Sequence, residues 1–140
     1  MARSDRKPKS TPASATPKER VLRRRAGRPG ISLLRDVMAA LRAPDGCPWD
    51  REQDHHTLRF HAVEEVYELI DAIEAGDQEE MIEELGDILL QVVFHCQLGQ
   101  ERGEFDFDTV CQRIAEKLIR RHPHVFGDAQ VKTVDGVWAQ

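Results

Sequence analysis

Cysteines and long apolar runs are scarce in this chain. Its cysteines, Cys47, Cys96 and Cys111, lie far apart and form no Cys-x-x-Cys pair. An odd, dispersed set argues against a disulfide framework and a structural zinc site, and it indicates reduced thiols in a cytoplasmic protein. The longest apolar run is far too short to cross a membrane, and the first residues lack the apolar core of a secretion signal. The sequence therefore favours one soluble domain with a tail and no membrane partner.

Positive charge is concentrated in residues 1–30, which hold ten Lys and Arg against two acidic residues. This segment has almost no large apolar side chain before Val21, so it cannot bury enough surface to offset the entropy of ordering, and we predict a disordered basic tail. A solubilising tail, a transit-like leader and an arm that contacts nucleic acid all fit this composition. Because the whole chain has a net charge of −5, residues 31–140 are strongly acidic. An acidic body suits a cation-binding protein better than a nucleic-acid binder.

Apolar residues recur at helical spacing through residues 31–140, which predicts an all-α domain there. The expected helices cover residues 31–43, 57–75 and 77 to about 102, followed by a fourth that ends at Pro123, with a loop over 45–54. Their expected N-cap residues are Ser32, Thr57, Asp77 and either Asp106 or Asp108. Gly76 is expected to end the second helix. The third helix is apolar on more than one face in its second half, which in so small a domain indicates an oligomer.

Carboxylates occupy the second and third expected helices at spacings of three and four residues: Glu64, Glu65, Glu68, Glu84 and Asp87. Residues so spaced share a helical face, so antiparallel packing would bring four or five of these carboxylates together. Such like charges repel, and a hard divalent cation, above all Mg²⁺, relieves the repulsion. The alternative is an ordinary solvated face. The apolar runs after Glu65 and Asp87 favour the interpretation as a cation site, because they place these carboxylates at the edge of a core, where an uncompensated charge is unfavourable.

Other side chains have both a structural and a ligand-binding interpretation. Trp49, in the loop over 45–54, either closes the end of the helical domain or forms a platform for a planar ligand such as a nucleobase. Near the end of the fourth helix, a basic cluster either stabilises the helix dipole or clamps phosphates; it consists of Lys117, Arg120 and Arg121. Glu52-Gln-Asp-His55 matches one half of a di-iron signature, but it occurs only once. We interpret His95 as a core or interface residue.

Several motifs in this order resemble those of the MazG family of nucleoside triphosphate pyrophosphohydrolases. They are Pro48-Trp-Asp with Gln53, Glu64-Glu-x-x-Glu68, Glu84-Leu-Gly-Asp87 and Lys117-Leu-Ile-Arg-Arg-His-Pro-His-Val-Phe-Gly127. The resemblance covers about residues 31–138. The carboxylate motifs are shared with a wider all-α pyrophosphohydrolase superfamily, and the other two narrow the resemblance to MazG. Many MazG proteins have two such domains, whereas one carboxylate set is present here, so a single-domain form or a fragment is expected.

The resemblance implies a four-helix-bundle-like domain over 31–140 that dimerises or forms a higher homo-oligomer. It implies that Glu65, Glu68, Glu84 and Asp87 hold Mg²⁺, with Mn²⁺ as a possible substitute. The implied reaction converts a nucleoside triphosphate to the monophosphate and pyrophosphate, with a house-cleaning role against non-standard nucleotides. Glu64 would orient the attacking water, Trp49 would contact the base, and the phosphates would be held by Lys117, Arg120 and Arg121. The alternatives are a non-catalytic, nucleotide-binding helical dimer and a di-iron enzyme.

Overall fold

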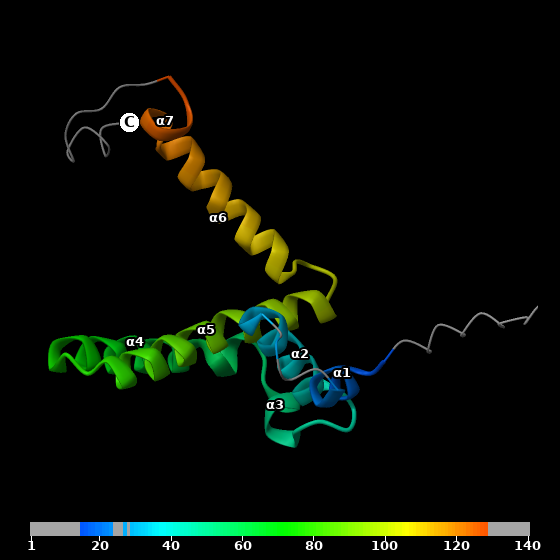
Figure 1. Cartoon of the computed structure of the whole chain (residues 1–140). Coiled ribbons are helices and arrows are strands. Elements are labelled where there is room, and N and C mark those ends of the chain that lie inside the picture. Colours follow the sequence, from blue (N-terminus) through cyan, green and yellow to red (C-terminus); the bar gives the residue numbers. More distant parts are fainter. Residues whose placement is uncertain (1–14, 24–26, 28, 129–140) are drawn as a thin grey trace, which may run out of the picture. The chain divides into compact units, whose positions relative to one another are not determined.

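The computed structural model of the protein describes residues 15–23, 27 and 29–128, and the regular elements in these ranges are all helices (Figure 1). The all-α prediction is therefore confirmed. The chain divides into two compact units, residues 1–52 and 53–140, and each is described separately below. No helix in the described ranges has the length and apolar character that a membrane span needs.

The first unit begins with a helix that the composition of residues 1–30 did not predict. Helix α1, Pro17–Arg23, lies inside the segment expected to be disordered, so that prediction is wrong for these residues. Its first turn is stabilised by a reciprocal pair of hydrogen bonds: the Glu19 amide donates to Thr16 Oγ1 at 3.2 Å, and the Thr16 amide donates to Glu19 Oε2 at 2.9 Å. Arg20 also pairs with Asp36 of the next helix at 3.3 Å. Residues 1–14, 24–26 and 28 of the expected tail lie outside the described residues.

Helix α2, Gly30–Arg42, and the short helix α3, Pro48–Glu52, complete the first unit. Pro29 is the N-cap of α2 and makes no side-chain capping bond, so the expected cap at Ser32 is wrong. A proline fixes φ near the value that precedes a helix, which allows α2 to start earlier. Met38 is buried, and α3 replaces part of the expected loop over 45–54.

The second unit is built on a helical hairpin of α4, His55–Ala75, and α5, Gln78–Glu101, which lie side by side (Figure 1). The turn between them confirms the expected stop at Gly76, which has a left-handed φ of 66°, and the expected cap at Asp77. The cap of α4 is Asp54 and not Thr57. Asp54 Oδ1 accepts from the Thr57 amide at 2.8 Å, while Thr57 Oγ1 accepts from the Asp54 amide at 2.9 Å.

The hairpin has its own apolar core, formed by buried side chains from both helices: Leu58, Ala72, Val93, Phe94, Cys96 and Leu98. At one end of this core, His55 Nδ1 lies 2.7 Å from His95 Nδ1, and the two rings stack with centroids 5.0 Å apart. The Phe105 ring packs on Gly99, where an added Cβ would meet it at 2.7 Å. His95 therefore has a structural partner in the same unit.

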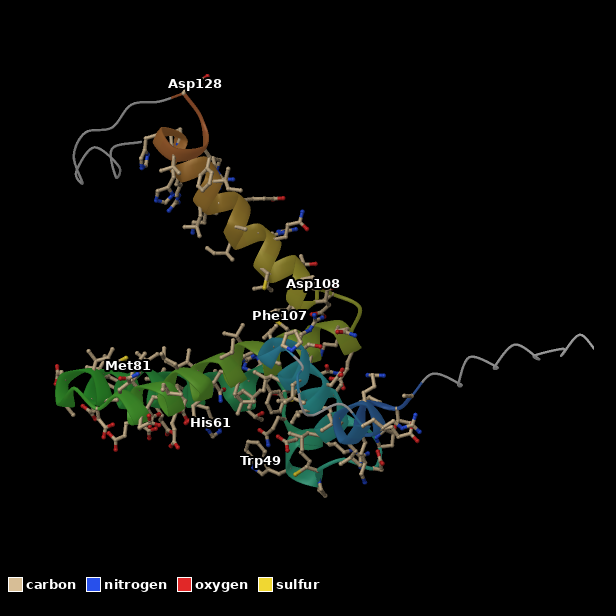
Figure 2. All side chains as sticks on the ribbon, viewed as in Figure 1. Trp49, His61, Met81, Phe107, Asp108 and Asp128 are labelled. Atoms are coloured by element: carbon tan, nitrogen blue, oxygen red, sulfur yellow. The ribbon has the colours of Figure 1, made fainter. Side chains whose placement is uncertain are left out.

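Helix α6, Phe107–Arg121, follows the hairpin and is capped by Asp106, which settles the choice left open between Asp106 and Asp108. It ends before Pro123, as predicted, and α7, Pro123–Phe126, follows. None of the residues of α6 is buried. Many apolar side chains of α4, α5 and α6 project from the helices (Figure 2), and the exposed ones include Val66, Tyr67, Ile70, Ile73, Leu85, Leu89, Ile114 and Leu118.

Candidate functional site

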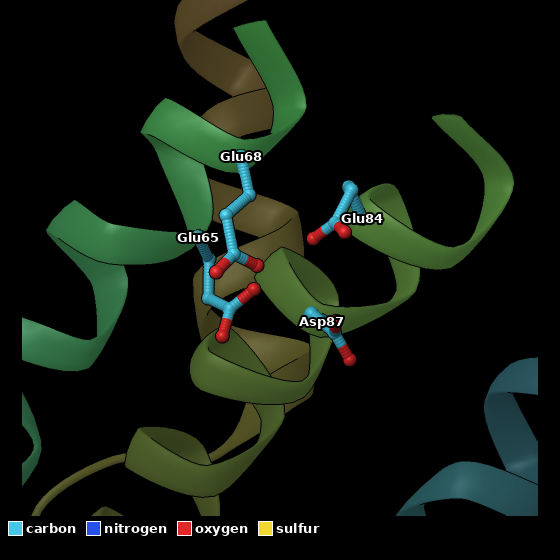
Figure 3. A group of neighbouring side chains, drawn as sticks. All are labelled: Glu65, Glu68, Glu84 and Asp87. Carbon is cyan, nitrogen blue, oxygen red and sulfur yellow. The ribbon is translucent and has the colours of Figure 1, made fainter. Parts of the chain in front are cut away.

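Four carboxylates converge between the two helices of the hairpin. Glu65 and Glu68 come from α4, and Glu84 and Asp87 come from α5 (Figure 3). Each offers one oxygen, and these oxygens all lie within 4.8 Å of one another. The pairs meet because residues three apart share a helical face and because the tight turn at Gly76 folds α5 back along α4. The structure thus brings together four of the five carboxylates singled out in the sequence.

The electrostatics of this group are unfavourable when nothing is bound. Removal from water raises the pKa of Glu65, and the charges of Asp87 and Glu68 raise it further. Removal from water is also the main cause that raises the pKa of Glu84 to about 7, together with its contact and charge repulsion with Glu68. Both shifts have the sign expected for like charges held close together. The site therefore favours either protons or a cation.

Two oxygens of the cluster have no partner. Glu65 Oε2 and Glu84 Oε2 are sealed from solvent and accept no hydrogen bond. Orphaned buried acceptors are uncommon, and on carboxylates they indicate a site for a positive ligand. The donor set consists of oxygens alone, which suits Mg²⁺ or Mn²⁺ rather than the softer metals that prefer thiolate or imidazole. The residues present therefore fit a hard divalent cation.

Glu64, the fifth carboxylate, is exposed on α4 and lies outside the group of four. The basic cluster is also exposed, on the last turns of α6, and comprises Lys117, Arg120 and Arg121. Just beyond it, His122 Nδ1 lies 2.6 Å from the Leu118 carbonyl oxygen, and its ring lies 5.4 Å from that of His124. These basic side chains surround the last turn of the helix, so a role in stabilising its dipole and a role in binding an anion are both compatible with their position.

Trp49 belongs to the first unit, on α3, and is 52% exposed, which disfavours a buried plug. Its helix is held in place by the arginines on either side. Arg42 Nη1 donates to the Asp50 carbonyl at 2.7 Å, and Arg51 Nη1 donates to the Pro44 carbonyl at 3.0 Å. The intervening turn packs tightly, since a Cβ on Gly46 would clash with the Leu41 carbonyl oxygen. The aromatic ring is therefore presented on a firm backbone.

The Glu52-x-x-His55 pattern does not lead to a di-iron site in the described part of the chain. His55 is paired with His95, and the one candidate metal group found among the described residues contains no histidine. No sequence pattern predicted the His55–His95 pair, because the two residues lie 40 positions apart. None predicted a role for Gln91 either, whose Oε1 is buried without a hydrogen-bond partner.

Comparison with known proteins gives consistent matches. The family model for the MazG nucleotide pyrophosphohydrolase domain matches residues 53–126. The nucleoside triphosphate pyrophosphohydrolase/pyrophosphatase MazG of Thermotoga maritima is 55% identical over 69% of this chain and 38% of its own length. The nucleoside triphosphate pyrophosphohydrolase of Escherichia coli is 47% identical over 79% of this chain and 42% of its length. The uncharacterized protein YabN of Bacillus subtilis is 49% identical over 78% of this chain and 22% of its own length. The chain thus spans less than half the length of these relatives.

Proposed function

The chain belongs to the MazG family, and on that basis we propose that it hydrolyses nucleoside triphosphates to nucleoside monophosphates and pyrophosphate. The observation that carries the proposal is the cluster of four carboxylates with two orphaned oxygens. Such a cluster is costly unless a divalent cation binds, and nucleoside triphosphates are bound in cells together with Mg²⁺. Two of the relatives have names that state this activity.

In this proposal Mg²⁺, or Mn²⁺ in its place, is held by Glu65, Glu68, Glu84 and Asp87. When bound, the cation neutralises phosphate oxygens and lowers the pKa of a coordinated water. The four side chains would fix its position between α4 and α5, because they come from two helices joined by a tight turn. Glu84 gives up its proton on loading below pH 7, since its pKa is raised to about 7 in the free protein. The pKa of Glu65 is raised in the same direction.

The reaction itself needs a water molecule positioned for attack on the α-phosphorus. Glu64, which is exposed and directly precedes Glu65 on α4, orients this water and accepts its proton. A bond forms between the water oxygen and the α-phosphorus, and the bond to the bridging oxygen breaks, so pyrophosphate leaves. The β- and γ-phosphates are held by Lys117, Arg120 and Arg121, which stabilise the charge on the leaving group. Trp49 contacts the base through its exposed ring.

We further propose that the chain acts as a homodimer or higher homo-oligomer, in which a bundle of four helices is completed by a second copy. Apolar side chains of α4 are exposed, including Val66 at 46%, Ile70 at 42% and Ile73 at 53%. A soluble protein rarely leaves so many apolar side chains of one element open to water. Sedimentation tests this proposal: Val66→Lys should give a monomer, whereas Asp71→Lys, a change at an exposed polar residue of the same helix, should leave the oligomer intact.

The substrate range expected of this enzyme is broad and includes non-standard nucleoside triphosphates, which is a house-cleaning role in the cytoplasm. The free thiols of Cys47, Cys96 and Cys111 fit that reducing compartment. The deciding experiment measures pyrophosphate and monophosphate release from a panel of triphosphates, with Mg²⁺ and with EDTA. Mg²⁺-dependent release of both products supports the proposal. Tight nucleotide binding without release would instead indicate a non-catalytic, nucleotide-binding dimer.

A further inference from the structure

Gln91 is a polar residue on α5 that the proposed mechanism does not use. It lies four residues after Asp87, and its side chain is half-buried. Its carbonyl oxygen, Oε1, is sealed from solvent and accepts no hydrogen bond. The same is true of Glu65 Oε2 and Glu84 Oε2 in the carboxylate cluster. Three orphaned acceptors therefore occur on the same helical hairpin.

The register of the hairpin places Gln91 next to the cluster. Residues four apart share a helical face, so Gln91 stands one turn beyond Asp87 on the face that carries Glu84 and Asp87. The following turn of α5 contains Phe94, which is 2% exposed and belongs to the apolar core. Gln91 thus lies along α5 between the carboxylates of the cluster and the apolar core of the hairpin.

The chemistry of the amide indicates what it binds. A buried carbonyl without a partner destabilises the folded protein, so such a group is expected to receive a donor when the site is loaded. An amide oxygen is neutral and adds no charge to the cation site. It is suited to a hydroxyl donor, and a loaded pyrophosphohydrolase site offers two: the sugar hydroxyls of the nucleotide and the waters that Mg²⁺ retains.

We propose that Gln91 Oε1 accepts a hydrogen bond from an O–H donor in the loaded site, either a sugar hydroxyl of the nucleoside triphosphate or an ordered water beside the carboxylates. The inference rests on the proposed function. It adds to that function a neutral acceptor that helps to select or position the ligand. Gln91 would then be kept at a cost to the stability of the free protein.

The test replaces Gln91 with methionine, which has a similar length and no carbonyl. The matched control is Gln100→Met, at an exposed glutamine of the same helix. Thermal unfolding of the free protein and of the protein with Mg²⁺ and a non-hydrolysable triphosphate gives a readout independent of turnover. We expect Gln91→Met to unfold at an equal or higher temperature when free, because the orphaned acceptor is gone, and to gain less from the ligands. A residue with only a structural role would lower the unfolding temperature of the free protein and leave the ligand-induced gain unchanged.

Steady-state kinetics then separates the two donors. Loss of one neutral hydrogen bond is expected to lower kcat/KM about tenfold. If the donor is a sugar hydroxyl, the 2′-deoxy or the 3′-deoxy substrate should lose that factor with the wild-type protein and show no further loss with Gln91→Met. If the donor is water, Gln91→Met should lower kcat/KM equally for every substrate.

Several outcomes would overturn the inference. One is a Gln91→Met protein that matches Gln100→Met in both the ligand-induced shift and the kinetics. Another is a loss of stability in the free protein with the ligand response intact. If the wild-type protein releases no pyrophosphate but is still stabilised by Mg²⁺ and nucleotide, the proposed function fails and the thermal shift still tests Gln91. A wild-type protein with neither response overturns both.

Discussion

Cation binding by this protein should depend steeply on pH, and Glu84 should be the main cause. Removal from water and the neighbouring carboxylates Glu68, Asp87 and Glu65 raise the pKa of Glu84 to about 7. Only the deprotonated carboxylate binds a cation, so loading at lower pH must displace a proton. The apparent dissociation constant should therefore fall as the pH rises toward 7, by almost tenfold per pH unit at the acid end and by about 50-fold in all between pH 5 and pH 7. Above that range it should level off.

The assay is a calorimetric titration with MgCl₂ or MnCl₂ between pH 5 and pH 8. Repeating it in buffers of different ionisation enthalpy counts the protons released on binding. Glu84→Gln should remove about one proton from that count and flatten the pH dependence, besides weakening binding. The matched control is Glu83→Gln, which removes the same charge from the next residue, an exposed one outside the cluster.

The raised pKa of Glu84 also makes the stability of the metal-free protein depend on pH. Because the folded pKa of Glu84 lies above its ordinary value of 4.5, the folded state binds more protons than the unfolded state between pH 4.5 and about 7. The contribution of Glu84 to the free energy of unfolding is fully present below pH 4.5 and is lost as the pH rises through about 7. His95 acts in the opposite direction, since burial lowers its pKa below 6.5. The contribution of Glu84 is therefore isolated by comparing how the free energy of unfolding varies with pH in the wild-type protein and in Glu84→Gln. Cation binding without proton release at pH 6 would refute this reasoning. So would a pH dependence of cation binding that is unchanged in Glu84→Gln.

Three further perturbations test other parts of the molecule. Glu68→Ala or Asp87→Ala should abolish Mg²⁺-dependent pyrophosphate release while circular dichroism still shows a helical protein; retained turnover in either variant would contradict the metal assignment. Leu58→Ala removes a side chain that is 1% exposed and should lower the free energy of unfolding by about 2–5 kcal/mol in urea titrations, whereas a change below about 1 kcal/mol would mean that the hairpin core adjusts easily. Arg42→Met removes the hydrogen bond to the backbone beside Trp49 and should raise KM for nucleotides more than it lowers kcat; an unchanged KM would argue against contact between Trp49 and the base.

Local signals were sufficient wherever one residue and its near neighbours decide the conformation. Gly76 ends α4 because it can adopt a positive φ, and Asp77 starts α5 because its carboxylate accepts from the Glu80 amide at 3.2 Å. The failures at Ser32 and Thr57 were also local. In each case a better-placed residue, Pro29 or Asp54, precedes the expected cap.

The helix α1 was missed for a related reason. Its capping signal, Thr16 followed three residues later by Glu19, is present in the sequence, but the surrounding basic composition outweighed it in the prediction. Contacts with α2, including the ion pair of Arg20 with Asp36, add stability that composition does not reveal. Composition describes an average over a segment, whereas a short helix depends on a few specific bonds.

Periodicity and capping over a few residues were enough to predict the helical class, the turn at Gly76–Asp77 and the pairing of carboxylates along each helix. The packing of α4 against α5 was needed to show that the carboxylate pairs meet within 4.8 Å, that two of their oxygens have no partner, and that Gln91 has a third such atom. Burial and orphaned atoms depend on how two helices pack against each other. That packing is set by many weak apolar contacts at once, and no single motif in the chain records it.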